Sequence, residues 1–365
     1  MKKLLLIDGN SMLFRAYYAT VYGRMMKTSN GIPTNAVYGF ITMINKAFDM
    51  IHPDMVLVAW DSGKPTFRHE TYTEYKGTRK ELDQELIVQF PIAREYLDAY
   101  GLQRYECDGI EADDIIGCMA RQHPELEIHI LSSDRDLLQL IDPTTDVYLM
   151  KKGISEIEVM NEEKLMETMG IKPSQIIDLK ALMGDTSDNI PGVPGVGEKT
   201  ATKIIVEYGS IENAYKHASE LKPPRASKNL VEYWDQAQMS KVLATIDVDA
   251  DFAYELEEAK LGNLYTEEAY VYFQRLQFKN LLNRFDVQSE NSIEDAFVIA
   301  VGKEEIKKIF AEAEKAQTVG AVLYKDTRNV LPLFAENAEI GGIGISFGKE
   351  KIYCIPAGNG YSMEE

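Results

Sequence analysis

LLLID, at residues 4–8, is the segment from which the fold of this chain can be inferred. A short unbroken apolar run that ends in an acid is typical of a strand buried on both faces of a parallel sheet. Two other segments repeat the pattern: residues 55–60 lead into Asp61, and residues 127–131 lead through two serines into Asp134. Helical patterns separate these segments, at residues 36–50, 85–100 and 112–122. Strands that alternate with helices predict a doubly wound α/β core around a parallel sheet.

Acidic residues gather where these strands end, and others follow in a helical segment and in a later loop. Sheets of this kind bind ligands at the carboxyl ends of their strands, so we expect the acids to share one site. The candidate metal ligands are Asp8, Asp61, Glu111, Asp113, Asp114, Asp134, Asp136, Asp185 and Asp188. Carboxylates that are brought together repel one another unless cations lie between them. Oxygen donors without histidine or cysteine favour Mg²⁺ or Mn²⁺, and two such ions about 3.5 to 4 Å apart suit displacement at phosphorus.

The spacing of the acids supports one site, but simpler explanations exist for some of them. A helix that begins near residue 111 puts Glu111 and Asp114 on one face, with Asp113 beside them. Acids in the first turn of a helix are also favoured by the helix dipole, and an isolated Asp after a strand is commonly a helix cap. Because three strand ends and one helix start all carry acids, a metal site is the favoured interpretation.

Charge and composition restrict the classes of function. The chain has 365 residues and a formal net charge of −19, which predicts two or three domains and excludes attraction of a polyanion by the molecule as a whole. A nucleic acid would need local basic patches, or acids masked by metal ions. Three cysteines without a Cys-x-x-Cys pair argue against disulfides and zinc sites, so we expect a cytoplasmic protein. The N-terminal apolar run is too short for a signal peptide, and no segment approaches the roughly 20 apolar residues of a membrane span.

Three regions of the chain differ in their patterns. Residues 1–170 carry the α/β pattern, whereas residues 171–290 show helices separated by Gly and Pro turns. A polar stretch at residues 288–291 suggests a linker. Residues 293–365 then show a strand, a helix and two strands, at residues 296–301, 303–316, 319–324 and 340–347. Because this last α/β pattern stops before a domain could close, we expect the chain to be a fragment of a longer protein.

The glycine-rich stretch IPGVPGVGEKT, at residues 190–200, has the composition of a phosphate-binding turn ahead of a helix. A nucleotide-binding P-loop is excluded, because Glu198 stands where a lysine must follow Gly197 and because a helical pattern precedes the stretch. Two alternatives remain: a plain turn between helices, and a hairpin whose amides grip a phosphodiester backbone. The candidate contacts are Gly192, Gly195, Gly197, Lys199 and Lys203.

KPTFRHETYTEYKGTRK, at residues 64–80, contains five Lys or Arg against two Glu. Phe67, Tyr72 and Tyr75 lie among the basic residues, which suits a single strand because cations hold phosphates and aromatic rings stack on bases. A solvated surface segment explains the same composition equally well. The segment follows Asp61 directly, so it would overhang the metal site.

Six blocks of the sequence resemble, in order, those of the 5′ nuclease domain of bacterial DNA polymerase I, which is related to flap endonucleases. The blocks are LLLIDGNSMLFRAYYA, AWDSGKPTFRHE, YKGTR, DGIEADDIIG, LSSDRDLLQL and GDTSDNIPGVPGVGEKTA, and the resemblance covers residues 1–290. It implies a Rossmann-like (PIN-like) nuclease core followed by a helical, helix-three-turn-helix DNA-binding region. It further implies that the first seven acids named above belong to a metal site, and that Asp185 and Asp188 hold a second ion, in part through water.

The resemblance also implies roles for basic residues. Lys76 and Arg79 resemble the arch cations that approach the scissile phosphate, and Arg68 is a weaker candidate. The turn from Gly192 to Thr200 resembles the motif that grips the backbone of duplex DNA, often with a K⁺ ion held by its carbonyls. Residues 293–365 resemble the start of a 3′-5′ exonuclease domain, but the acid-x-acid metal motif of that domain is missing from the strand VGAVLYKD at residues 319–326.

The resulting hypothesis is hydrolysis of DNA near a 5′ end or 5′ flap with two Mg²⁺ or Mn²⁺ ions, in primer removal and repair. The resemblance implies a monomer that carries a polymerase domain further along the full-length chain. Two alternatives remain: a DNA-binding scaffold without catalysis, and a relative that cleaves RNA.

Overall fold

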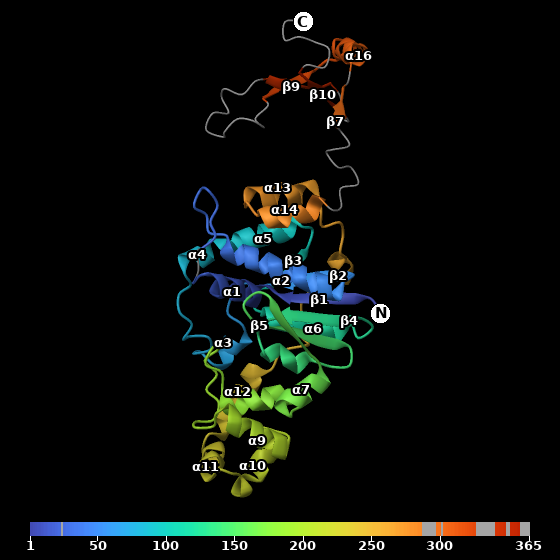
Figure 1. Ribbon diagram of the computed structural model, residues 1–365. Coiled ribbons are helices and arrows are strands. Elements are labelled where there is room, and N and C mark those ends of the chain that lie inside the picture. The colour runs from blue at the N-terminus through green and yellow to red at the C-terminus, as the bar shows by residue number, and fades with distance from the viewer. Residues whose placement is uncertain (23–24, 287–296, 301, 326–339, 348–350, 358–365) are drawn as a thin grey trace. The chain divides into compact units, whose positions relative to one another are not determined.

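The computed structural model in Figure 1 describes the chain except for residues 23–24, 287–296, 301, 326–339, 348–350 and 358–365. The chain forms two compact units, Met1–Lys279 and Asn280–Glu365. None of the helices within the described ranges has the length and apolar character needed to cross a lipid bilayer.

A six-stranded sheet forms the centre of the first unit. Its strands are β1 (Lys3–Asp8), β2 (Met55–Ala59), β3 (Gln103–Tyr105), β4 (Glu127–Ser132), β5 (Thr145–Lys152) and β6 (Glu156–Met160). Their order is β3-β2-β1-β4-β5-β6, and every neighbouring pair is parallel except β5 and β6. The chain first builds outward from β1 through β2 to β3 and then returns to place β4 on the other side of β1. This order confirms the predicted parallel α/β core, and β1, β2 and β4 are the three predicted strands.

The sequence pattern does not predict β3, β5 or β6. β3 and β6 are short edge strands with charged side chains, so they lack the unbroken apolar run that marks a buried strand. β5 does contain such a run at residues 147–150, all of them buried, and it is the one strand that the pattern should have predicted.

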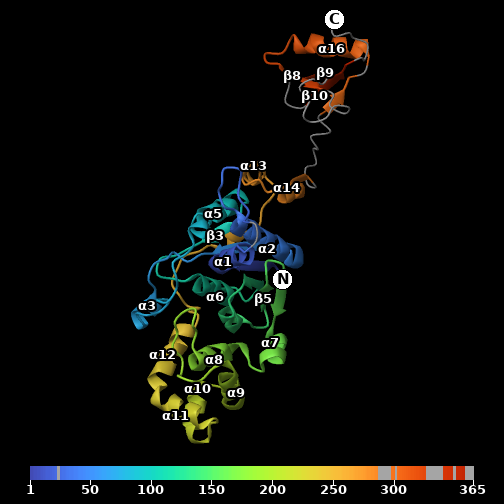
Figure 2. The same cartoon turned by 60° about the vertical axis from the view of Figure 1, so that its left-hand side comes forward.

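Helices cover both faces of the sheet. They are α1 (Gly9–Thr20), α2 (Asn35–Ile51), α3 (Phe67–Thr71), α4 (Gln84–Ile87), α5 (Gln89–Ala99) and α6 (Ala112–Gln122). Figures 1 and 2 show α2 and α5 on one face of the sheet and α6 on the other. Leu4 and Leu6 of β1 share an apolar cluster with Ile115 and Met119 of α6. Residues 4–7 have no exposed surface, which explains why β1 is apolar at every position instead of at alternate ones.

The predicted helices at residues 36–50 and 112–122 correspond to α2 and α6. The predicted helix at residues 85–100 is instead two helices, α4 and α5, with Val88 between them. Pro91 explains the break, because it has no N–H group to donate to the carbonyl of Ile87 one turn earlier.

The rest of the first unit is helical. The elements are η1 (Asp136–Leu140), α7 (Glu162–Met169), η2 (Pro173–Gln175), α8 (Ile176–Met183), α9 (Glu198–Tyr208), α10 (Ile211–Lys216), η3 (Ala218–Glu220), α11 (Pro224–Glu232), α12 (Trp234–Ala244), η4 (Leu256–Ala259), α13 (Glu267–Arg275) and, across the boundary between the units, α14 (Lys279–Asp286). No strand occurs between residues 173 and 285, all of which the structure describes. Val193 and Ile204 share the apolar cluster that contains Leu4 of β1. The hydrophobic core therefore continues across the predicted boundary at residues 170–171.

Beyond α14, the second unit contains a four-stranded sheet and one described helix. Its elements are β7 (Phe297–Ile299), α16 (Lys303–Ala313), β8 (Gly320–Lys325), β9 (Ile340–Ser346) and β10 (Ile352–Pro356). The sheet order is β7-β10-β9-β8, and only β7 and β10 are parallel. The predicted strand, helix and two strands are present, and β10 is an additional strand. The predicted linker at residues 288–291 lies outside the described residues, and the likeness of this unit to a 3′-5′ exonuclease domain stays a prediction.

The close contact between the first residue of α1 and the sheet gives a test of the fold. A Cβ atom on Gly9 would lie 2.6 Å from Cε2 of the buried Trp60 ring and 3.0 Å from the Ala59 carbonyl oxygen. We expect Gly9→Ala to lower the free energy of unfolding by about 1–3 kcal/mol, because this core has no room for a methyl group. Urea denaturation measures the change. Gly262→Ala is the control, since a Cβ at Gly262 has no neighbour within 4 Å; equal stability of the two variants would contradict the expectation.

Candidate active site

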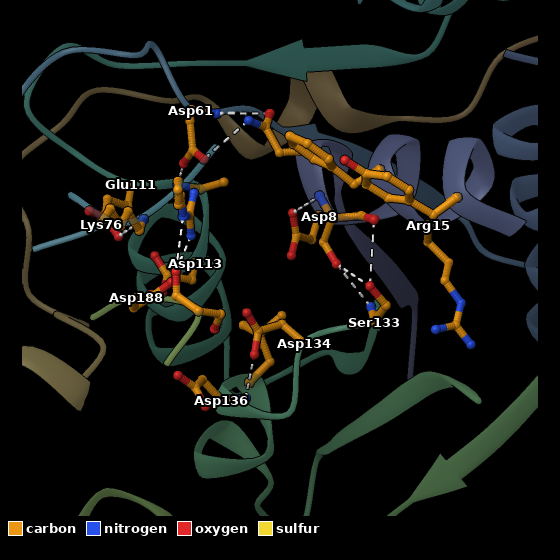
Figure 3. Close-up of a pocket in the computed structure, with 18 of the residues that line it drawn as sticks. Asp8, Arg15, Asp61, Lys76, Glu111, Asp113, Ser133, Asp134, Asp136 and Asp188 are labelled. Carbon is orange, nitrogen blue, oxygen red and sulfur yellow. Dashed lines mark hydrogen bonds and ion pairs between the residues drawn. The ribbon is translucent and has the colours of Figure 1, made fainter. Parts of the chain in front are cut away.

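A cavity of about 610 Å³ opens at the carboxyl ends of the central strands. Seven of the nine predicted acids line it: Asp8, Asp61, Glu111, Asp113, Asp134, Asp136 and Asp188. They come from three strand ends, from the start of α6 and from the loop after α8. Figure 3 shows their side chains arranged around one open space. The topology of the sheet therefore brings together residues that lie up to 180 positions apart in the sequence.

Hydrogen bonds at the end of β1 fix Asp8. Its Oδ1 accepts from the backbone N–H of Ser11 at 3.0 Å, so Asp8 is the N-cap of α1. Its Oδ2 accepts from the hydroxyl of Ser132, at the end of β4, at 2.8 Å. The helix-cap explanation for this acid is thus correct, and it is compatible with a place in the cavity because the capping carboxylate also lines the cavity wall.

Asp61 follows β2 and links the end of that strand to α1 and to the start of α6. Its Oδ2 accepts from the side-chain amide of Asn10 at 3.1 Å, and its Oδ1 accepts from the backbone N–H of Ala112 at 2.8 Å. The second bond satisfies one of the free N–H groups at the N-terminus of α6. It also sets the position of Asp113 in the first turn of that helix relative to the strand end.

Asp134 and Asp136 follow β4 in the same tight turn. Oδ1 of Asp134 accepts from the backbone N–H of Asp136 at 2.9 Å. Nζ of Lys180 lies 2.6 Å from Oδ1 of Asp136 and also pairs with Asp185. Lys180 comes from the last turn of α8, so a residue that the sequence analysis did not select holds two of the predicted ligands.

Asp114 is not placed to bind a metal ion in the cavity, which corrects the prediction. Its two oxygens accept from the two terminal nitrogens of Arg68, each at 2.7 Å, and Oδ1 also accepts from the backbone N–H of Asp247. The Arg68 and Asp114 side chains are each only 2% exposed. Asp114 thus serves as the buried counter-ion of Arg68.

Arg68 and Tyr75 are likewise not available to contact DNA, contrary to prediction. Arg68 is 1% exposed, and its guanidinium also donates to the backbone carbonyls of Leu243 and Thr245 at the C-terminal end of α12. The ring of Tyr75 is buried, and its hydroxyl lies 3.1 Å from Oε2 of Glu111 and 3.2 Å from Oδ2 of Asp188. Tyr72 is half-buried against a small apolar cluster. These two tyrosines therefore pack the segment onto the protein, whereas Phe67 is exposed.

Lys76 and Arg79 line the cavity, as their predicted role requires. Nζ of Lys76 lies 2.8 Å from Oε2 of Glu111, and a terminal nitrogen of Arg79 lies 2.7 Å from Oδ1 of Asp188. The Arg79 side chain is 50% exposed, so its guanidinium stays hydrated when it exchanges this partner for another anion.

Asp185 is the second predicted ligand that does not line the cavity. Its Oδ1 accepts from the backbone N–H and the hydroxyl of Ser187, at 2.7 and 2.6 Å, and its Oδ2 pairs with Lys180. A role for Asp185 as a metal ligand stays a prediction, and it would require Lys180 to give up this pair.

Burial disfavours the ionised form of several of these carboxyl groups and so raises their pKa values. Burial raises the pKa of Asp8 to about 7, and burial together with the nearby Asp134 carboxylate raises the pKa of Asp136 to about 7. The pKa values of Asp113 and Asp134 are raised for the same main reason, loss of hydration. Burial acts in the same direction on Glu111, but Lys76 and Arg68 outweigh it and lower the pKa of that carboxyl.

The chemistry of the donor set fits hard divalent cations. All seven acids offer carboxylate oxygens, and no histidine or cysteine lines the cavity. Across the described part of the chain, however, no three acidic, histidine or cysteine side chains are close enough to hold one ion by themselves. Mg²⁺ commonly keeps several waters and takes only one or two carboxylates, so widely spaced acids are compatible with this ion.

The predicted hairpin lies between α8 and α9, and its residues differ in exposure. Gly192 is buried: its N–H donates to the Ser240 hydroxyl, and its carbonyl accepts from Gln236. A Cβ at Gly192 would lie 2.3 Å from the backbone nitrogen of Gly184, so this glycine permits close packing and is not placed to contact DNA.

Other residues of the hairpin are placed as a backbone-binding motif requires. Gly195, Gly197, Lys199 and Lys203 are exposed, and Thr200 is half-buried. Gly197 is the N-cap of α9, so the first N–H groups of that helix face outward beside two lysines. The carbonyl of Pro194 accepts from Asn229. A K⁺ ion at this turn stays a prediction.

Besides Lys180, several residues of the site were not predicted from the sequence. Phe14, Arg15 and Tyr18 of α1 line the same cavity. They follow Asp8 by one to three helical turns, and this spacing is the signal that could have identified them. For Lys180 the signal was its position five residues before Asp185, in the last turn of a helix that leads into the acidic loop.

Two family models match the chain consecutively. The model of the 5′-3′ exonuclease N-terminal, resolvase-like domain covers residues 3–170, and the model of the 5′-3′ exonuclease C-terminal SAM fold covers residues 171–267. DNA polymerase I of Bacillus subtilis is 42% identical over 307 residues, which are 82% of this chain and 34% of that protein. DNA polymerase I of Geobacillus stearothermophilus is 45% identical over 290 residues, 79% of this chain and 33% of that protein. The chain thus spans about a third of the length of these relatives.

Solved structures share the fold. A phage T5 5′-exonuclease with bound zinc ions superposes with a TM-score of 0.57 and 20% identity, over 78% of this chain and 97% of that chain. A phage T5 flap endonuclease in a complex with DNA and metal ions gives a TM-score of 0.54 and 21% identity, over 79% of this chain and all of that chain.

The raised pKa of Asp8 predicts a pH-dependent stability. The folded carboxyl has a pKa of about 7 and the unfolded one the ordinary value of 3.8, so the folded state binds more protons between these values. Raising the pH through this interval without divalent ions therefore destabilises the fold. We expect Asp8→Asn to lose less stability than the wild type between about pH 5 and pH 7 in urea denaturation. The exposed Asp251→Asn is the control, and an unchanged slope for Asp8→Asn would contradict the assignment.

The buried pair of Arg68 and Asp114 predicts a large loss of stability when one partner is removed. We expect Arg68→Met to lower the free energy of unfolding by about 3–5 kcal/mol, because the Asp114 carboxylate stays buried without its counter-ion. Adding Asp114→Asn to that variant should restore part of the loss, since the uncompensated charge is gone. Urea denaturation of the wild type and both variants measures the two steps. A second substitution that destabilises further would show that the charge is not the cause.

Proposed function

Because the chain belongs to the 5′-3′ exonuclease family, we propose that its first unit is a divalent-metal-dependent nuclease that hydrolyses DNA near a 5′ end or 5′ flap. The observation that carries the proposal is the convergence of seven acids, from five separate segments, on one cavity that also contains Lys76 and Arg79. Structural roles account for single acids, such as Asp8 as a helix cap, but they do not explain a shared cavity. Homology to the 5′-3′ exonuclease part of DNA polymerase I agrees with the proposal.

The acids that line the cavity are the proposed holders of two Mg²⁺ or Mn²⁺ ions. Asp8, Asp61, Glu111, Asp113, Asp134 and Asp136 form the first group. Asp188 extends it toward a second ion, with Asp185 joining if Lys180 releases it. Ions bound there would supply an activated water and offset the negative charge of the departing 3′ oxygen. Mg²⁺ is preferred because the donors are all carboxylates.

The chain's own cations would hold the scissile phosphate. Lys76 lies beside Glu111 at the cavity wall, where an ammonium group offsets charge on the phosphoryl oxygens. Arg79 is half-exposed and suits a phosphate that replaces its present partner, Asp188. Lys76 is held at the cavity wall before the substrate arrives, whereas Arg79 changes its partner when the phosphate binds.

The hairpin before α9 is the proposed grip on duplex DNA. Exposed glycine amides and two lysines at the N-terminus of an eleven-residue helix suit a phosphodiester backbone and carry no sequence information. We include a K⁺ ion at this turn in the proposal. A solved phage T5 flap endonuclease that shares this fold is in a complex with DNA and metal ions.

The role of the complete protein is also a proposal, because the chain spans only about a third of its relatives. These relatives are DNA polymerase I, so we propose a polymerase domain in cis, action in primer removal and repair, a monomeric state and a cytoplasmic location. Two other functions use the same features: a DNA-binding scaffold without catalysis, and a nuclease specific for RNA. The raised pKa values of Asp8, Asp113, Asp134 and Asp136 favour catalysis over a scaffold, because strongly perturbed carboxyl groups that share one cavity are typical of functional sites.

Removal of one acid tests the proposal. We expect Asp134→Ala to lower the rate of Mg²⁺-dependent cleavage of a labelled 5′-flap DNA by more than the roughly 10- to 100-fold that is typical for groups one step removed from a metal. Binding of the same DNA, measured by fluorescence anisotropy in EDTA, should change little, because Asp134 contributes no positive charge to the interface.

The controls separate the three functions. Asp251→Ala removes an exposed acid away from the cavity and should cleave at the wild-type rate. Absence of cleavage by the wild type would favour the scaffold, and preference for an RNA flap of equal sequence would favour the RNA nuclease. Normal cleavage by Asp134→Ala would contradict the proposed site.

A further inference from the structure

Two loops that are more than 100 residues apart are joined by hydrogen bonds beside the cavity. One is the arch segment, residues 72–80, and the other is the acidic loop, residues 185–190. The backbone N–H of Lys76 donates to the carbonyl of Asp188 at 2.8 Å. Nε of Arg79 donates to the carbonyl of Ser187 at 3.3 Å, and its terminal nitrogen pairs with Asp188. The acidic loop is thus a support against which the arch segment rests.

The conformation of Lys76 depends on this support. Its φ of 56° lies in the left-handed region of backbone conformation, which residues other than glycine rarely adopt. Such a conformation persists only where neighbouring groups hold it. Here the N–H of Lys76 is bonded to Asp188, and the turn directs its Nζ to Glu111 in the cavity. The position of the proposed phosphate-binding ammonium therefore depends on a backbone turn.

Asn189 holds the other side of this contact. Its side-chain amide donates to the carbonyl of Glu74 at 2.6 Å, two residues before Lys76. That carbonyl also accepts from the N–H of Gly77, so Asn189 closes the turn that contains Lys76. Asn189 itself has a φ of 56°, a conformation that asparagine tolerates well. The left-handed conformation of Asn189 turns the acidic loop back on itself, so that Asp185 and Ile190 exchange two backbone hydrogen bonds, at 2.9 and 2.7 Å.

Asn189 does not line the cavity and offers no charge to a metal ion or phosphate. It directly precedes Ile190, where the proposed DNA-binding hairpin begins. We propose that Asn189 is a positioning residue: it clamps the acidic loop to the arch segment and so holds Lys76 over the reacting phosphate. The inference rests on the proposed nuclease function, because Lys76 matters there only if a phosphate is cleaved. It adds that the side-chain amide of Asn189 connects the proposed DNA-binding hairpin, which begins at Ile190, to the turn that carries Lys76.

Two substitutions at Asn189 separate its side chain from its backbone. Asn189→Gly keeps the left-handed backbone free of strain but removes the amide donor. Asn189→Asp keeps the size of the side chain but turns an oxygen toward the Glu74 carbonyl. We expect both variants to cleave a 5′-flap DNA at least roughly tenfold more slowly in single-turnover reactions, with DNA affinity in EDTA nearly unchanged, because small displacements of a catalytic group are costly. Hydrogen exchange of the Lys76 amide should be faster in both.

Asn213→Asp is the matched control. Asn213 is exposed, and its side-chain amide also donates to a backbone carbonyl, that of Tyr208 at 2.8 Å, away from the arch segment. It should leave cleavage and exchange of the Lys76 amide unchanged. Wild-type cleavage by Asn189→Gly, with or without faster exchange, would overturn the positioning role. If the wild type itself does not cleave, the proposed function fails, whereas unchanged exchange in the Asn189 variants would overturn the clamp independently.

Discussion

Repulsion among buried carboxylates is the constraint on which the rest of this structure depends. Seven acids face one cavity, and burial alone would keep several of them protonated near neutral pH. The protein balances some of this charge with its own cations: Arg68 holds Asp114, Lys76 holds Glu111, and Lys180 holds Asp136. Asp8, Asp113, Asp134 and, despite Lys180, Asp136 retain raised pKa values, so part of the charge is left for ions that the site would bind.

The three balancing cations come from three different parts of the chain, and each joins elements that the sheet alone does not connect. Arg68 ties the start of α3, the helix just before the arch segment, to α6 and to the end of α12. Lys180 ties α8 to the turn after β4. The same ion pairs therefore neutralise charge and hold the tertiary structure together. This explains why the helical region shares one core with the α/β region instead of forming a separate body.

Neighbouring acids in the sequence have different roles because a helix turns by about 100° per residue. Asp113 faces the cavity, whereas Asp114 faces Arg68 in the interior. Glu111 is the extended N-cap of α6 and is not part of the predicted helix face, although both Glu111 and Asp114 contact Arg68. Glu111 lines the cavity, whereas Asp114 does not, because Arg68 covers it. Tyr75 and Gly192 likewise have residue types that suit DNA contact, but both residues are buried and are not placed to contact DNA.

The sequence by itself determined the parallel core, because unbroken apolar runs such as residues 4–7 are stable only as strands covered on both faces. It also determined that the acids at three strand ends would meet, since the carboxyl ends of parallel strands share one edge. The tertiary structure decided which acids remain open to the cavity and which are paired inside. This depends on Arg68 and Lys180, whose partners lie 46 and 44 residues away for Asp114 and Asp136, and contacts at that separation leave no periodic signal in the sequence.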